Sequence, residues 1–130
     1  MTITVYGEPI GKGRPRFTKN GHIYTPARTK EYEKKIRTAF MEQTGEKLDG
    51  PIYAHLTAYM RIPESAPKKR KQDMEEGKIR PEIKPDLDNI VKCLDALNGL
   101  AFDDDKSIVA VVAEKWYSNT PRLEIVLEQL

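Results

Sequence analysis

One stretch of the sequence, from position 52 to position 62, alternates between two sets of side chains with a period of two. Successive residues of a β-strand point to opposite faces, so the pattern predicts a long strand with one buried face. A fold built around such a strand needs a sheet that is covered on one side. The residues predicted to face the core are Ile52, Ala54, Leu56, Ala58, Met60 and Ile62.

The other periodic segments indicate a small α+β protein. Apolar residues recur at helical spacing in positions 29–43, where Gly45 ends the helix, and again in positions 87–97. A chain of 130 residues is the size of one domain. We therefore predict a single domain, residues 1–130, with helices packed on a mixed β-sheet. Further strands are expected at positions 3–6, 22–24, 107–117 and 123–127, the last two joined as a hairpin by a turn at 118–121.

Positions 63–85 are rich in proline and charge and almost free of apolar residues. The segment includes the basic run from Lys68 to Lys71. It lies between a strand and a helix of one small core, so it need not mark a domain boundary. Two descriptions fit this composition, a mobile linker and an exposed short helix, and in either case we expect a flexible basic arm.

Charge is distributed unevenly along the chain, although the formal net charge is only +2. Positions 1–40 carry nine Lys or Arg against three Glu, whereas positions 86–105 carry six Asp against the single base Lys92. This distribution suits a protein that attracts a polyanion with one region and binds metal cations with another. The alternative is that both regions are ordinary solvated faces.

Several classes of protein are excluded or disfavoured. No apolar run reaches the length of a membrane-spanning helix, and the N-terminus lacks the features of a signal peptide, so we expect a cytoplasmic protein. The single cysteine, Cys93, excludes an internal disulfide and a thiolate zinc cage. The loop around Lys12 lacks the spacing of a phosphate-binding loop, so no nucleotide cofactor is expected.

The most informative segment is acidic. On the predicted helix at positions 87–97, Asp88, Lys92 and Asp95 form a stripe at the border of the apolar face. Asp86 precedes this helix, and an aspartate triplet follows at 103–105. Carboxylates that converge raise one another's pKa unless they bind a cation, and oxygen ligands suit Mg2+ or Mn2+. The chemistry offered is metal-assisted cleavage of a phosphodiester, with Lys92 donating to the phosphate or the leaving group.

Simpler roles exist for each part of this cluster. Asp86 and Asp88 are suited to compensating the helix dipole, and the triplet is suited to a solvated turn. Asp88 and Lys92 have the spacing of a surface ion pair. Taken together, these roles do not explain why the acids gather at the edge of an apolar helix in a chain whose other end is basic.

The sequence resembles the RusA family of Holliday junction resolvases, which are small phage-associated and bacterial endonucleases. The resemblance is carried by Lys84-Pro85-Asp86-Leu87-Asp88-Asn89, Lys92, Asp95-Ala96-Leu97-Asn98-Gly99 and Asp104-Asp105, with Gly11-Lys12-Gly13-Arg14-Pro15-Arg16 and Tyr24-Thr25-Pro26 in the N-terminal half. It implies a homodimer that binds four-way DNA junctions in recombination and repair, and that nicks two opposing strands with Mg2+ or Mn2+.

The resemblance also implies roles for individual residues. The metal-binding aspartates of the family fall on Asp86, Asp88 and Asp105, its catalytic lysine falls on Lys92, and Asp104 is a helper. The family pattern places three residues between the lysine and Asp-Ala-Leu, whereas two stand here, which leaves the role of Asp95 open. The alignment of the triplet also allows Asp103 or Asp104 in place of Asp105.

Our leading hypothesis is a dimeric α+β endonuclease with one aspartate-lined metal site in each subunit. One rival is a non-catalytic junction- or DNA-binding phage accessory protein that keeps the fold. A third class, a protein-binding module that uses positions 63–85, has little support because this arm lacks apolar anchors. The side chains expected to hold DNA phosphates are Lys12, Arg14, Arg16, Lys68, Lys69, Arg70 and Lys71.

Overall fold

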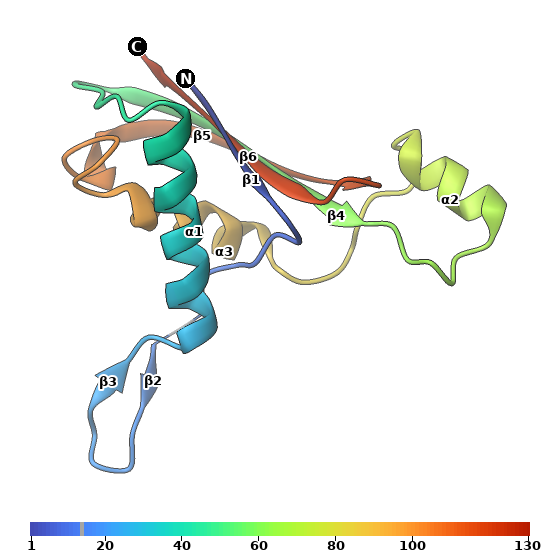
Figure 1. Cartoon of the computed structure of the whole chain (residues 1–130), viewed down its shortest axis with the longest axis horizontal. Coiled ribbons are helices and arrows are strands. Elements are labelled where there is room, and N and C mark those ends of the chain that lie inside the picture. Colours follow the sequence, from blue (N-terminus) through green and yellow to red (C-terminus); the bar gives the residue numbers. More distant parts are fainter. Residues whose placement is uncertain (14) are drawn as a thin grey trace.

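The computed structural model describes residues 1–13 and 15–130, so the prediction for Arg14 lies outside the described residues. Its centre is a four-stranded sheet in the order β1-β6-β4-β5 (Figure 1). Strand β4 pairs in parallel with β5, and the other two pairs are antiparallel, which confirms the predicted mixed sheet. The strands are β1 (Thr2–Tyr6), β4 (Ile52–Arg61), β5 (Ile108–Ser118) and β6 (Arg122–Gln129).

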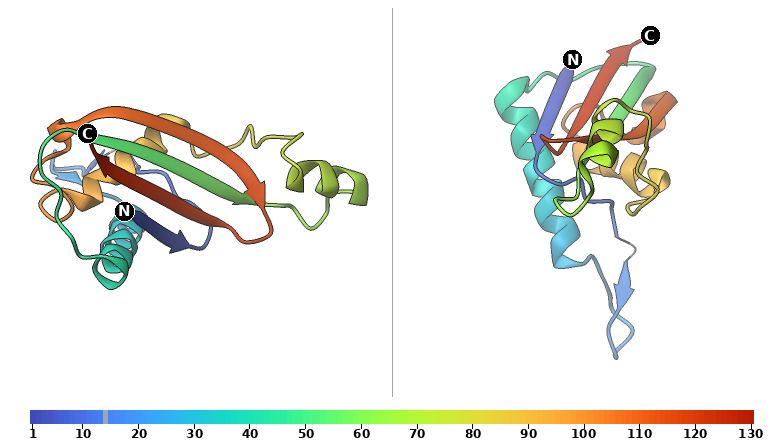
Figure 2. Two further views of the ribbon diagram at one scale, coloured as in Figure 1. Left: turned by 90° about the horizontal axis from the view of Figure 1, so that it is seen from above. Right: turned by 90° about the vertical axis from the view of Figure 1, so that its right-hand side faces the viewer.

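Strand β4 is buried on the face that the alternation predicted, from Ile52 to Met60. Helix α1 (Ala27–Gln43) packs against this layer through Ile36 and Phe40, both about as buried as a side chain can be. The helix begins two residues before the predicted start and ends as predicted, where Gly45 takes a left-handed φ of 64°. Figure 2 shows the four strands side by side, with α1 next to β1.

The predicted turn at 118–121 exists, but the hairpin does not. Strands β5 and β6 both pair with β4, which lies between them. A turn signal reports only that the chain reverses, whereas pairing is decided by burial. Because β4 carries the longest run of buried alternate positions, it takes the central place with a partner on each side.

The helix predicted at 87–97 forms in two parts. An α-helix, α3 (Leu87–Val91), continues as the 3-10 helix η1 (Lys92–Leu97). The carbonyl of Asn89 accepts a hydrogen bond from the backbone N–H of Lys12 (3.0 Å), so the N-terminal loop is attached where the helix tightens. The helical spacing predicts an apolar face of Leu87, Ile90, Val91, Leu94 and Leu97. Ile90, Leu94 and Leu97 are buried in the core, whereas Leu87 is 41% exposed because it is the first residue of α3.

Two extensions project from this body in different directions (Figure 1). One is a hairpin of β2 (Arg16–Phe17) and β3 (Ile23–Tyr24) that precedes α1. The other carries helix α2 (Lys68–Glu75). Of the two alternatives for positions 63–85, a mobile linker and an exposed short helix, the structure has the helix. Its return path is fixed to β5, because the Arg80 guanidinium lies 3.3 Å from the centre of the Trp116 ring.

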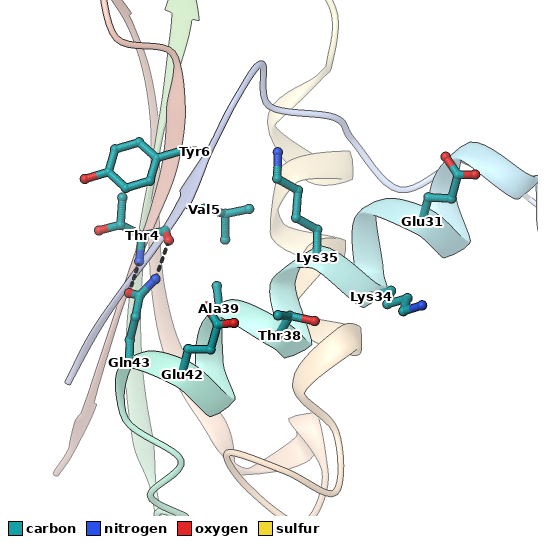
Figure 3. Close-up of a pocket in the computed structure, with 10 residues that line it drawn as sticks. All are labelled: Thr4, Val5, Tyr6, Glu31, Lys34, Lys35, Thr38, Ala39, Glu42 and Gln43. Carbon is teal, nitrogen blue, oxygen red and sulfur yellow. Dashed lines mark hydrogen bonds between the residues drawn. The ribbon is translucent and has the colours of Figure 1, made fainter.

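The outer edge of β1 is closed by a side chain. The Gln43 amide, at the end of α1, donates to the carbonyl of Thr4 (2.7 Å) and accepts from its N–H (2.8 Å), as Figure 3 shows. A glutamine that satisfies both backbone groups of an edge residue takes the place of a neighbouring strand.

Candidate functional site

Two parts of the acidic segment meet in a shallow groove of about 210 Å3. In a 3-10 helix, residues three apart eclipse each other, so η1 presents Lys92 and Asp95 on the same side. Asp105 joins them from the short 3-10 helix η2 (Asp105–Ser107), which directly precedes β5. The apolar side chains that complete the groove are Val91, Leu94, Ile108 and Val111.

The carboxylates of this groove interact directly. A hydrogen bond with Asp95 and a second with Asp104 raise the pKa of Asp105 above its usual range. The pKa of Asp104 is lowered, because its side chain accepts a hydrogen bond from the backbone N–H of Lys106 (2.9 Å) at the start of η2. Carboxylates this close hold either a shared proton or a cation between them.

Lys12 reaches this acidic group from the N-terminal loop. Its ammonium lies 3.1 Å from the Asp95 carboxylate and 3.9 Å from Glu33 on α1. A residue expected to hold DNA phosphate is thus engaged with acids of its own chain. The loop comes this close because position 11 is glycine: a Cβ there would stand 2.7 Å from the Cβ of Pro85.

Asp86 lines a different cavity, of about 330 Å3, between the N-terminal loop and the start of α3. Lys12 lines this second cavity as well, so it lies between the two acidic positions. Asp88, in the first turn of α3, is exposed and belongs to neither lining. A larger cavity of about 430 Å3, between β1 and α1, contains none of the predicted site residues (Figure 3).

Residues 1–13 and 15–130 contain no group of three or more His, Cys, Asp or Glu side chains placed to hold a metal ion. The structure therefore brings Lys92 and Asp105 together and adds Asp95, while the convergence of Asp86 and Asp88 on Asp105 stays a prediction. The donors present are still of the right kind, because Mg2+ commonly takes one or two carboxylates and completes its shell with water and substrate phosphate.

Asp95 is the residue whose role the sequence leaves open, and no motif in the sequence points to Glu33. The position of Asp95 in one stripe with Lys92 is the signal that points to it. Asp103, the alternative member of the triplet, forms an ion pair with Lys47 on the segment before β4. Its side chain is therefore engaged outside the groove.

The remaining predicted DNA-binding side chains lie on the two projecting extensions. Arg16 begins the hairpin and is exposed. On α2, Lys68 and Arg70 are exposed, Lys71 is partly buried, and Lys69 pairs with Asp73 one turn later (3.1 Å). Both extensions therefore carry exposed basic side chains, and their contact with DNA stays a prediction.

No helix in the part of the chain that the structure describes is long and apolar enough to cross a membrane. Cys93 is buried in η1 with its thiol near the carbonyl of Ile10 (3.3 Å), and burial raises its pKa to about 12. The thiol therefore packs in the core.

Comparison with known proteins agrees with the resemblance. A family model described as "Endodeoxyribonuclease RusA" matches residues 6–128. The chain is 37% identical, over 137 aligned positions, to a protein of Bacillus subtilis (strain 168) named "Uncharacterized protein YqaN". The alignment covers all of this chain and 96% of that protein.

Proposed function

Because the chain belongs to the RusA endodeoxyribonuclease family, we propose that it is a metal-dependent endonuclease that resolves four-way DNA junctions by paired symmetric nicks. The observation that carries the proposal is the groove in which Lys92 stands beside Asp95 and Asp105. An acidic groove with one lysine, on a protein whose extensions are basic, suits cleavage of a phosphodiester. We place its biological role in DNA recombination and repair, in the cytoplasm of a bacterial or prophage-carrying cell.

The cofactor in this proposal is Mg2+ or Mn2+, and its ligands are Asp86, Asp88 and Asp105, with Asp104 as a helper. Binding of the cation would have to draw Asp86 and Asp88, which lie outside the groove lining, toward Asp105. When bound, such a cation activates water and neutralises charge on the phosphate oxygens. The shared hydrogen bonds of Asp105 support a site that needs positive charge. Lys92, which is exposed and lines the groove, would donate a hydrogen bond to the phosphate or the leaving oxygen.

DNA binding in this proposal rests on the two basic extensions and the N-terminal loop. Arg16 and the basic side chains of α2 would bind phosphates, which fixes the position of the DNA without reading its sequence. Because Lys12 forms an ion pair with Asp95 at the groove, we assign it to a phosphate close to the scissile bond. Arg14 keeps its assignment from the sequence.

We further propose that the active form is a homodimer joined through β5. Its C-terminal half is covered, because Arg80 donates to the carbonyl of Lys115 (2.7 Å). Its N-terminal half exposes Val109 (61%), Val111 (42%) and Val112 (41%). Two copies of one strand pair antiparallel about a two-fold axis, so the contact closes on itself and relates two sites symmetrically.

The test is cleavage of a labelled four-way junction, compared with linear duplex, with and without Mg2+. We expect paired nicks in the junction only when Mg2+ is present. Asp88→Asn and Asp105→Asn should each lower the nicking rate by about 100-fold or more, the usual effect of removing a group that stabilises transition-state charge. Asp49→Asn, an exposed aspartate before β4, is the matched control and should cleave normally.

Junction binding by both variants should persist, since the removed charges are not phosphate contacts. Unimpaired cleavage by Asp88→Asn and Asp105→Asn would refute the proposed site. Salt-sensitive junction binding with no metal-dependent cleavage by the unmodified protein would favour the rival, a non-catalytic DNA-binding accessory protein. Degradation of the linear duplex would indicate a general nuclease.

A further inference from the structure

The β2–β3 hairpin, residues 16–24, presents apolar side chains to solvent. Phe17 lies directly across from Ile23, and Arg16 across from Tyr24. Directly opposed residues of an antiparallel pair project on the same face, so one face of the hairpin carries Phe17 and Ile23 and the other carries Arg16 and Tyr24. The exposed fractions are 71% for Phe17 and 66% for Ile23.

The turn of the hairpin holds this pair in register. Gly21 donates its N–H to the carbonyl of Thr18 (3.0 Å) with a φ of 79°, and the N–H of Thr18 donates to the carbonyl of His22 (2.8 Å). The His22 N–H also donates to the hydroxyl of Thr18 (3.1 Å). A type I turn followed by a left-handed glycine is a common hairpin connection. These hydrogen bonds fix the conformation of the hairpin that carries Phe17 and Ile23.

An isolated two-stranded hairpin is marginally stable in water, and a projecting Phe–Ile pair adds apolar surface that water disfavours. A binding partner would therefore stabilise the hairpin, and the charge around it indicates what kind of partner this is. Positions 9–30 hold six Lys or Arg and no acid. A second copy would bring the same positive charge against this one, whereas a polyanion would be attracted.

The hairpin also starts close to the acidic groove. Only residues 13–15 separate Arg16 from Lys12, which contacts Asp95. Consecutive Cα atoms are 3.8 Å apart, so the two residues are at most about 15 Å from each other. DNA held by the hairpin is therefore within a few nucleotides of the groove.

We propose that the hairpin is a branch-point wedge: the Phe17–Ile23 pair enters between bases at the crossover of the junction, while Arg16 and Lys19 bind the flanking phosphates. The inference rests on the proposed function and names the part of the DNA that this hairpin recognises. Apolar side chains are used in this way to unstack base steps, and the energy required is least where bases are already poorly stacked. A crossover offers such bases, whereas a linear duplex does not.

The test measures binding without cleavage, in EDTA, using the full chain. The probe is a four-way junction with 2-aminopurine at the crossover, a fluorescent base whose emission rises when it is unstacked. Binding of the unmodified protein should raise the emission, and Phe17→Ala should abolish the rise and weaken junction affinity roughly 5- to 100-fold. Affinity for linear duplex should change little.

Three further variants distinguish a base-unstacking wedge from a phosphate contact and from a general loss of apolar surface. Phe17→Leu, which keeps an apolar side chain, should retain most of the emission change. Arg16→Gln should lower the slope of log affinity against log salt by about 1, whereas Phe17→Ala should leave this slope unchanged. Met41→Ala, on the far end of α1 and also 60% exposed, is the matched control and should bind like the unmodified protein.

Equal junction affinity and emission change for Phe17→Ala and the unmodified protein would overturn the inference. So would a loss of dimer mass in Phe17→Ala, measured by light scattering, because it would make the hairpin a contact between copies. Failure of the unmodified protein to bind junctions would overturn the proposed function as well. Binding with the expected emission change but without Mg2+-dependent nicking would support the wedge and refute the nuclease.

Discussion

The two edge strands of the sheet, β1 and β5, differ in how far their outward backbone groups are covered. At β1 the edge strand is five residues long, and the Gln43 amide occupies both outward backbone groups of Thr4. At β5 the edge strand is eleven residues long, and only its C-terminal half is covered. Open edges invite pairing with other chains, and proteins normally blunt them. This difference between the edges supports the proposal that β5 pairs with a second copy of the chain.

The largest expected effect comes from placing charge on the open edge. Val109→Lys combined with Val112→Lys, two exposed positions of β5 that do not line the acidic groove, would put four ammonium groups at a two-fold contact, and like charges at an interface strongly oppose association. We expect a monomer at concentrations where the unmodified protein is a dimer, together with loss of paired nicking. Light scattering and the junction assay measure the two outcomes.

Met41→Lys, which charges an exposed apolar position on α1, should leave the dimer unchanged. A dimer that survives the double β5 substitution would place the interface elsewhere, and the exposed half of β5 would then not be the contact between copies.

A smaller effect is expected from uncovering the other half of β5. Arg80→Ala removes the stacking on Trp116 and the hydrogen bond to the carbonyl of Lys115, and should lower the free energy of unfolding by about 1–2 kcal/mol. The arm at 63–85 should also become more sensitive to protease. Chemical denaturation and limited proteolysis measure these changes.

Arg80→Lys separates the two interactions, because lysine keeps the charge but not the planar stacking group. Stability and protease resistance equal to those of the unmodified protein in Arg80→Ala would show that the covered half of β5 does not depend on this contact.

The smallest effect is expected at the closed edge. Gln43→Ala frees the N–H and carbonyl of Thr4, which water can then reach, so the loss of stability should be only about 1 kcal/mol. The more informative result is association, since β1 becomes an edge that can accept a strand. Light scattering at rising protein concentration should show species larger than those of the unmodified protein.

Gln72→Ala, on the exposed arm, provides a matched loss of one amide. If Gln43→Ala and Gln72→Ala associate equally little, Gln43 does not protect the edge, and the contrast between β1 and β5 is weaker than proposed.

Local patterns predicted most of the elements of this fold. The alternation at 52–62 and the helical spacing at 29–43 are readable because burial repeats with the period of each structure. The pairing of strands is not local, which is why the turn at 118–121 predicts a hairpin although β4 lies between β5 and β6. The change to a 3-10 helix at Lys92 comes just after the backbone hydrogen bond between Asn89 and Lys12, and no pattern in positions 87–97 predicts it.

The candidate site was predicted in part for the same reason. Residues three or four apart on a helix can be placed together from the sequence, and Lys92 with Asp95 is such a pair. The approach of Asp105 depends on how η2 returns the chain to β5, and the contact between Lys12 and Asp95 joins positions 83 residues apart. Contacts of that range follow from the packed fold, so the sequence indicated which residue types matter but not which of them meet.

The close seating of the N-terminal loop has a consequence for the acidic groove. Gly11 lies against Pro85 and Asn89 with no space for a side chain, so its contacts fix how closely the N-terminal loop packs on α3. The position of Lys12, the next residue, is fixed with it. The carboxylate of Asp95 thus has a counterion that is part of the polypeptide and is delivered by folding itself. Dilution or dialysis cannot remove it, so even without dissolved cations some of the repulsion in this region is already balanced.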